Sequence, residues 1–158
     1  MSIAASVATY LSQAGIPYEV IAHPRTSDST HSAQAAHVPG DQLAKCVMLE
    51  DDDGYLMAVL PATRHVDLGA LHRRFGRELG LATESELDLL FRDCAQGAMP
   101  PLGDAYGIDA IVDQSLIGVQ DVYFEAGDHC ALVHVSGNDF LKLMGDAPRG
   151  RISHHAAH

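Results

Sequence analysis

The stretch from residue 43 to residue 61, LAKCVMLEDDDGYLMAVLP, consists of two apolar runs separated by an acidic turn. Each run has the length of a strand, and the Asp-Gly pair at residues 53–54 is a common hairpin signal. The pattern therefore predicts two antiparallel, largely buried strands joined by the acidic turn. The first strand begins with Lys45, one of only two lysines in the 158 residues.

Helices and strands are expected on both sides of this hairpin. Further strands are predicted over 18–23, 109–118, 121–127 and 130–136, and helices over 3–14, 31–38, 67–76, 83–91 and 137–145. Asp67 is placed to cap one helix, and Thr83 with Glu86 has the spacing of a capping box. Since the elements do not alternate in a strict βαβ order, we expect a mixed, mostly antiparallel sheet flanked by helices.

The composition and length indicate one globular domain, expected over residues 1–147, followed by a flexible C-terminal tail over 148–158. Apolar residues make up 47% of the chain and charged residues 20%. The formal net charge is −11, which does not suit a tight, non-specific nucleic-acid binder. Any contact with nucleic acid is therefore expected to be local.

Cysteine usage and hydropathy bear on the location of the protein. The three cysteines, Cys46, Cys94 and Cys130, are widely spaced and odd in number, which predicts reduced thiols and a cytoplasmic location. No apolar stretch approaches the roughly 20 residues that cross a bilayer, so no membrane contact is expected. The first 15 residues predict a helix rather than a signal peptide.

Lys45 is the first candidate for a functional residue. A lysine at the end of an apolar strand can aim its ammonium group into a pocket, because its strand neighbours fix the backbone. The alternative is that its aliphatic stem covers apolar surface while the ammonium group reaches water. The local sequence leaves both readings open.

Two loops are further candidates. The stretch GAMPPLG, from Gly97 to Gly103, is a stiff loop that can form one wall of a pocket or serve as a rigid connector. The stretch EAGDH ends in His129, which is either part of an ordinary hairpin turn or a proton carrier turned toward a pocket.

Other catalytic chemistries find no support in the sequence. The ten histidines form no HExxH or HxH pattern, and only the group His154, His155 and His158 could bind a metal adventitiously. The sequence contains no GxSxG, GxGxxG or P-loop motif. Cys46 directly follows Lys45, so the two side chains should face opposite ways and Cys46 belongs in the core. We expect no native metal and no cofactor.

The order and spacing of these segments resemble the YbaK/EbsC family, the aminoacyl-tRNA synthetase-associated or prolyl-tRNA synthetase editing domain. The segments are LAKCVML, DCAQGAMPPLGDAYG, VDQSLIG, VYFEAGDH and DFLKL. The resemblance extends from the first predicted helix to about Met144. The lysine at the head of a strand and the Gly-x-x-Pro-Pro-x-Gly loop are its most specific parts.

The resemblance implies a fold, an activity and a set of site residues. The implied fold is a single α/β domain with a barrel-like, mixed, mostly antiparallel sheet. The implied activity is hydrolysis of mischarged aminoacyl-tRNA, such as alanine or cysteine on tRNA(Pro), with a synthetase such as prolyl-tRNA synthetase as a possible partner. By the same resemblance Lys45 is the catalytic residue, and the substrate-binding residues are Gly97, Pro100, Pro101, Gly103, Gly127 and His129.

Several points stay open at this level. In one reading the Lys45 ammonium stabilises negative charge on the carbonyl oxygen during ester hydrolysis; in another it holds the terminal phosphate or ribose. A non-catalytic module that binds an amino acid, a nucleotide or a synthetase is the alternative function. Arg73, Arg74 and Arg77 either contact phosphates or form a solvated helix face. The loop GAMPPLG is less glycine-rich than that of the cysteine-specific branch, so the edited amino acid is open as well.

Overall fold

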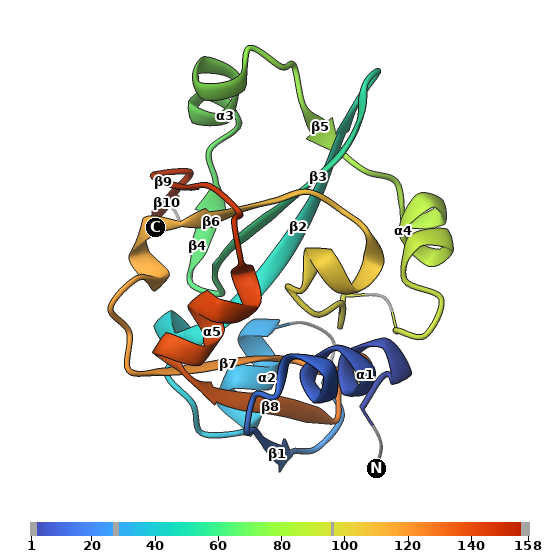
Figure 1. The fold of residues 1–158 in the computed structure, drawn as a ribbon, viewed down its shortest axis with the longest axis vertical. Helices are drawn as coiled ribbons and strands as arrows, with labels where there is room; N and C mark the ends of the chain where they lie inside the picture. The colour runs from blue at the N-terminus through green and yellow to red at the C-terminus, as the bar shows by residue number, and fades with distance from the viewer. Residues whose placement is uncertain (1–2, 27–28, 96, 156–158) are drawn as a thin grey trace.

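The computed structural model describes residues 3–26, 29–95 and 97–155 (Figure 1). Helices and strands are mixed along the chain, and three short 3₁₀ turns (η1–η3) connect them. The elements are α1 (Ala5–Ala14), β1 (Glu19–Ala22), α2 (Ser29–Ala35), η1 (Gly40–Gln42), β2 (Leu43–Asp51), β3 (Gly54–Pro61), β4 (Arg64–Val66), α3 (Leu68–Phe75), β5 (Gly80–Leu81), α4 (Glu84–Leu90), η2 (Gly103–Tyr106), β6 (Ala110–Asp113), η3 (Gln114–Leu116), β7 (Asp121–Glu125), β8 (Ala131–Ser136), α5 (Gly137–Met144), β9 (Arg149–Gly150) and β10 (Ser153–His155).

The core of the fold is a mixed sheet whose strands follow the order β1-β8-β7-β2-β3-β6-β9, with β5 paired to β2. The predicted hairpin is confirmed: β2 and β3 pair antiparallel along their whole length, from Ala44 opposite Pro61 to Asp51 opposite Gly54. The sheet is mixed and mostly antiparallel, as expected. The pairs β1–β8, β7–β8, β2–β3 and β2–β5 are antiparallel, whereas β2–β7, β3–β6 and β6–β9 are parallel.

The sheet does not close into a barrel, which corrects the barrel-like shape that the resemblance implied. Its path ends at β1 on one side and at β9 on the other. Strand β9 has two residues and β1 has four, so neither end of the sheet offers a long row of backbone groups for closure.

Helices cover both faces of the sheet. Val7 and Leu11 of α1 and Phe140 and Leu143 of α5 belong to the main buried cluster on one face. On the other face α2 and α3 each pack over a smaller cluster. Figure 1 shows α1, α2 and α5 gathered at the end of the molecule near β7 and β8, while α3 lies at the opposite end.

The helix caps predicted from the sequence are confirmed. Helix α1 ends at Gly15, which has a φ of 68°. The Asp67 side chain accepts a hydrogen bond from the backbone N–H of Ala70, and Thr83 and Glu86 form a reciprocal capping box. Helix α5 is capped by Ser136, one residue before the helix predicted over 137–145.

The C-terminal segment differs from the expected flexible tail. Its residues pair as β9 with β6 and as β10 with β4, and Ile152 between them is 1% exposed. The backbone N–H of Ile152 donates to Asp113 Oδ1 at 3.0 Å. This buried hydrogen bond and the strand pairing explain why residues 149–155 join the fold; His158 lies outside the described residues.

Asp113 is the anchor for this segment. Burial acts to raise the pKa of its carboxyl group, but hydrogen bonds from Ser115 and from the N–H of Ile152 outweigh burial and lower the pKa. The ionised carboxylate is therefore the form that the folded state favours.

We predict that Asp113→Ala lowers the free energy of unfolding at pH 7 by about 1–3 kcal/mol, because it leaves buried N–H groups unsatisfied. The folded-state pKa lies below its unfolded value, so this stabilisation is complete above about pH 4 and is lost as the pH falls through the lowered pKa. Urea unfolding of both proteins between pH 7 and pH 3 measures the difference. Asp146→Ala, at an exposed carboxylate, is the control. Equal losses in the two variants, or a difference that does not shrink in acid, would contradict the anchoring role.

Candidate active site

Lys45 is the third residue of β2 and lies in the middle of the sheet. It pairs with Leu60 of β3, and its side chain is half-buried. Its Nζ donates a hydrogen bond to the carbonyl oxygen of Ala62, just beyond the end of β3, at 3.4 Å. An ammonium group has three donor hydrogens, and this contact uses one of them.

Near Lys45, the other edge of β2 pairs with β7, and the two strands run parallel with Ala44 opposite Phe124. One step further along both strands, this register brings Lys45 level with Glu125. Ala44 and Phe124 both belong to the main buried cluster. Because side chains alternate along a strand, Lys45 and Glu125 face the other side of the sheet, where α2 packs.

Glu125 and His129 form a buried polar pair next to Lys45. Glu125 is 1% exposed and His129 is 3% exposed, and Glu125 Oε1 lies 4.0 Å from His129 Nδ1. Burying a carboxylate is costly unless positive charge or hydrogen-bond donors lie close to it. Here Glu125 has the His129 imidazole at 4.0 Å, and the β2–β7 register places Lys45 on the same face of the sheet.

The loop that carries His129 has a constrained backbone. His129 has a φ of 59°, in the left-handed region that residues other than glycine rarely adopt. Its carbonyl oxygen accepts a hydrogen bond from the N–H of Thr26, and the next N–H, of Cys130, donates to Asp128 Oδ1 at 2.9 Å. Such backbone outliers persist where the surroundings fix them, and they are frequent at functional sites. His129 thus holds a backbone conformation that its surroundings fix, and its functional role stays a prediction.

Gly127 connects this loop to the loop that contains the two prolines. Its carbonyl oxygen accepts a hydrogen bond from the N–H of Ala95 at 2.6 Å. Its φ is 111°, and a Cβ at this position would lie 2.9 Å from the Cβ of Ala4 and 3.5 Å from Cys94 Sγ. Both the backbone conformation and the lack of space require glycine here.

The diproline loop meets β2 through Cys46 rather than through Lys45. Cys46 Sγ donates to the carbonyl oxygen of Met99 at 3.6 Å, and Cys46 faces the main buried cluster. Pro100, Pro101 and Gly103 are buried, whereas Gly97 is exposed with a φ of 79°. A Cβ on Gly103 would lie 2.4 Å from the carbonyl oxygen of Ile108, so only glycine fits.

The structure therefore brings the three segments together at one end of β2. By strand alternation, however, the contact of the diproline loop lies on the face opposite Lys45. That this loop forms a pocket wall facing the ammonium group stays a prediction.

Glu125 is a buried residue near Lys45 that no local sequence pattern singles out. Its only signal was an acidic residue at the end of the apolar strand VYF, where a solvent-exposed turn was the simplest reading. Its importance follows from the β2–β7 pairing, which joins segments about eighty residues apart.

The thiols near the site are poor nucleophiles. Burial raises the pKa of Cys46 to about 12, and burial is also the main cause that raises the pKa of Cys94 to about 12. The Tyr106 hydroxyl lies 3.3 Å from Cys94 Sγ and donates to Asp93 Oδ1 at 2.9 Å. A thiol with so high a pKa stays protonated at neutral pH, which agrees with the core role expected for Cys46.

We predict that Cys46 resists alkylation in the folded protein. With a pKa of about 12, its thiolate fraction at pH 8 is on the order of 10³ below that of an ordinary cysteine. Iodoacetamide labelling at pH 8, followed by mass spectrometry of the Cys46 peptide, measures the rate. The same reaction in guanidinium chloride is the control and should be fast. Rapid labelling of Cys46 in the folded state would instead revive a thiol nucleophile beside Lys45.

The described residues offer neither a metal centre nor a membrane span. Within them, no three His, Cys, Asp or Glu side chains are grouped to hold a metal ion. His154 lies next to His65, with ring centroids 6.0 Å apart, on the small sheet of β4 and β10. In the same part of the chain, no helix combines the length and the apolar character that crossing a bilayer requires.

A cavity of about 490 Å³ lies away from the Lys45 cluster. It is lined by residues of α3, η2, β6 and the end of α5, including Arg77, Asp109 and Met144. Of the expected site residues it contains only Gly103. Volume alone does not identify a site, so a functional assignment has to rest on the chemical character of the lining residues.

Comparison with known proteins bears on the family of the chain rather than on individual residues. The family model described as "Aminoacyl-tRNA editing domain" matches residues 23–143, which include all the expected site residues. None of the curated proteins compared with the chain matches it significantly.

Solved structures share the fold over nearly the whole chain. One is a protein proposed to be a trans-editing enzyme for prolyl-tRNA synthetase, with a TM-score of 0.82 at 26% identity over 97% of this chain and 99% of that one. Another is the hypothetical protein APE2540, with a TM-score of 0.83 at 21% identity over 94% and 99% of the two chains. A scaffold used for computational epitope grafting matches with a TM-score of 0.82 at 22% identity, over 96% of both chains.

Proposed function

Because the chain belongs to the aminoacyl-tRNA editing domain family, we propose that it is a trans-editing hydrolase that deacylates mischarged aminoacyl-tRNA. We further propose that its substrate is a small amino acid, such as alanine or cysteine, on tRNA(Pro), and that it acts in the cytoplasm. The structural similarity to a protein proposed to edit in trans for prolyl-tRNA synthetase supports this choice and suggests the same kind of synthetase as a partner.

One observation carries the proposal: Lys45 is half-buried in β2, directly after the residue that pairs with Phe124 of β7, and β7 continues into the buried pair of Glu125 and His129. Aminoacyl-tRNA presents an ester carbonyl next to a vicinal ribose hydroxyl. Attack by water places negative charge on the carbonyl oxygen, and a positioned ammonium group stabilises that charge. We assign this role to Lys45.

The remaining steps require no nucleophile from the protein. The vicinal ribose hydroxyl of the substrate orients and activates the water, whose oxygen forms the new bond to the carbonyl carbon. The ester C–O bond then breaks, and the departing ribose oxygen takes up a proton to give the free tRNA end and the amino acid. This route agrees with the absence of a GxSxG motif in the sequence and with the protonated Cys46.

The other site residues shape and hold the pocket in this proposal. Gly127 and His129 fix the loop beside the ester, and Gly97, Pro100, Pro101 and Gly103 form the stiff wall that limits the size of the amino-acid side chain. A pocket discriminates one methylene by only about 1–3 kcal/mol, so editing works best by excluding larger side chains.

We predict that Lys45→Ala lowers kcat for deacylation by about 10²–10³-fold, because it removes the cation that stabilises the developing oxyanion. The assay is a panel of mischarged tRNAs, with and without synthetase. Lys142→Ala is a matched control, since Lys142 is the other lysine of the chain and is exposed on α5. Wild-type protein that hydrolyses none of the panel, even with synthetase present, would point to a non-catalytic binding module instead.

We predict that Glu125→Gln lowers kcat by about tenfold or more while KM changes little. The substitution keeps the shape of the side chain but changes a buried carboxyl group that lies 4.0 Å from His129 and, by the β2–β7 register, on the same face of the sheet as Lys45. Steady-state deacylation kinetics measure the effect, and circular dichroism checks the fold. We do not expect Glu125→Asp to restore kcat, because the shorter aspartate side chain places its carboxyl group in a different position. Unchanged kcat in Glu125→Gln would exclude a role for this carboxylate.

A further inference from the structure

Positive charge is concentrated on one part of this acidic protein. Residues 64–75 and 149–155 contain five of the chain's ten Lys and Arg residues but only one of its twenty-one Asp and Glu residues. The five are Arg64, Arg73, Arg74, Arg149 and Arg151. The other five cations share the rest of the chain with twenty carboxylates.

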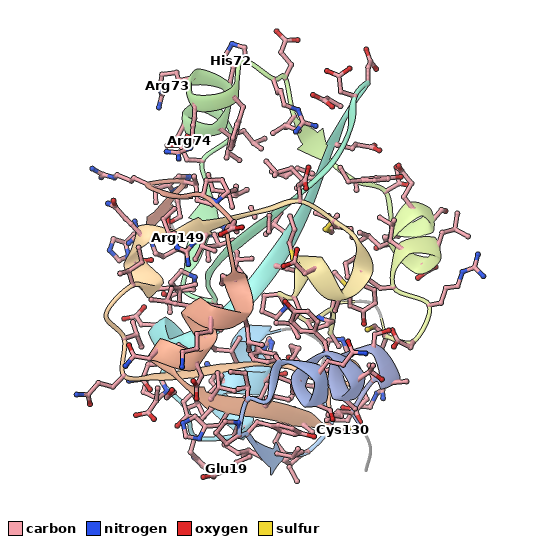
Figure 2. All side chains as sticks on the ribbon, viewed as in Figure 1. Glu19, His72, Arg73, Arg74, Cys130 and Arg149 are labelled. Carbon is pink, nitrogen blue, oxygen red and sulfur yellow. The ribbon has the colours of Figure 1, made fainter. Side chains whose placement is uncertain are left out.

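The fold brings these two segments together. Strand β10 pairs with β4, so that His155 lies opposite Arg64, and the N–H of Asp67 donates to the carbonyl oxygen of Ile152 at 2.7 Å. The guanidinium of Arg74 lies so close to Gly150 that a Cβ there would be 2.8 Å from its nitrogen. In Figure 2 Arg73 and Arg74 on α3 and Arg149 lie on the same side of the molecule. We call this set of five residues the arginine surface.

Some of these arginines hold the structure, and others face solvent. Arg149 donates to the carbonyl oxygens of Gly145 and Leu141, while Arg64 donates to Ser153. Arg73 and Arg151 are exposed, and within the described residues neither makes a hydrogen bond or an ion pair. Their charges are therefore available to a partner.

Arg77 does not belong to this surface, although it lies in the same basic run of the sequence. Its Nε and a terminal nitrogen donate to Asp51 at 2.7 Å and 2.8 Å. Hydrogen bonding to Arg77 is the main cause that lowers the pKa of Asp51 to about 2. Arg77 thus fastens the segment after α3 to the β2–β3 turn.

The arginine surface starts at the proposed active site. The Lys45 ammonium donates to Ala62, only two residues before Arg64, and β4 then leads away from the site to α3 (Figure 1). Three residues of strand and eight of helix span roughly 20 Å. A row of cations that begins at the aminoacyl end and extends over this length fits the phosphate backbone of a helical stem, because double-stranded RNA is recognised mainly through its shape and phosphates.

We propose that the arginine surface binds the phosphate backbone of the tRNA acceptor stem and so directs the aminoacyl end to Lys45. This inference rests on the proposed function for the identity of the RNA. It adds the C-terminal segment, with Arg149 and Arg151, to the parts of the chain that meet the substrate.

The test compares two double variants that each remove two positive charges. Arg73→Ala/Arg151→Ala alters the surface, whereas Arg92→Ala/Lys142→Ala removes exposed cations from α5 and from the end of α4. Fluorescence anisotropy with deacylated tRNA gives Kd over a range of salt concentrations. We expect the surface variant to bind about tenfold more weakly at low salt and to lower the slope of log Kd against log salt by about two, with the control unchanged.

Kinetics separate this inference from the proposed function. With mischarged tRNA, the surface variant should raise KM and leave kcat unchanged, and with a 3′-aminoacyl-adenosine, which lacks the stem, it should match the wild type. The surface assignment is overturned if the two double variants lose tRNA binding equally or if neither loses it. It is also overturned if the wild type binds anionic lipid vesicles but not tRNA. If the wild-type protein hydrolyses no mischarged tRNA but still binds tRNA in a salt-dependent way, only the proposed reaction is refuted.

Discussion

The parallel pairing of β2 with β7 is the constraint on which the proposed chemistry depends. It joins a strand from the first third of the chain to one from the last third, and its register sets which side chains lie level with each other. With Ala44 opposite Phe124, Lys45 comes beside Glu125 on the face away from the main core. A slip of one residue would turn the ammonium group into the apolar cluster, where an unpaired charge is costly.

This pairing also explains why the lysine can be half-buried at all. On its other side β2 is fixed to β3 along its full length, so the backbone at Lys45 has neighbours on both edges. The Lys45 ammonium group donates to the Ala62 carbonyl oxygen, and Glu125, which follows the paired residues of the neighbouring strand, lies 4.0 Å from His129. A charge held by a rigid backbone needs little reorganisation when the substrate binds, which is the condition for effective electrostatic catalysis.

Local signals in the sequence were sufficient for most elements but not for their long-range arrangement. The Asp-Gly turn predicted the β2–β3 hairpin, and Thr83 with Glu86 predicted the start of α4. Strands β5, β9 and β10 have two or three residues each, too few to show an alternating pattern, which is why the sequence predicts a tail over 148–158. Lys45 was identified by its rarity and by a family resemblance, whereas Glu125 depends on a register between distant strands, which no local pattern encodes.

The charge distribution gives the acidic composition a physical meaning. If the arginine surface receives the acceptor stem, the carboxylates over the rest of the molecule repel phosphates from every other direction. At physiological salt such repulsion is screened beyond about 8 Å, so it acts on RNA that is already close and in the wrong orientation. The net charge of −11 then weakens non-specific binding of RNA, while the arginine surface still binds the acceptor stem in the productive orientation. Specificity arises here from the difference in charge between the arginine surface and the rest of the molecule, since a uniformly basic protein would hold any RNA in any orientation.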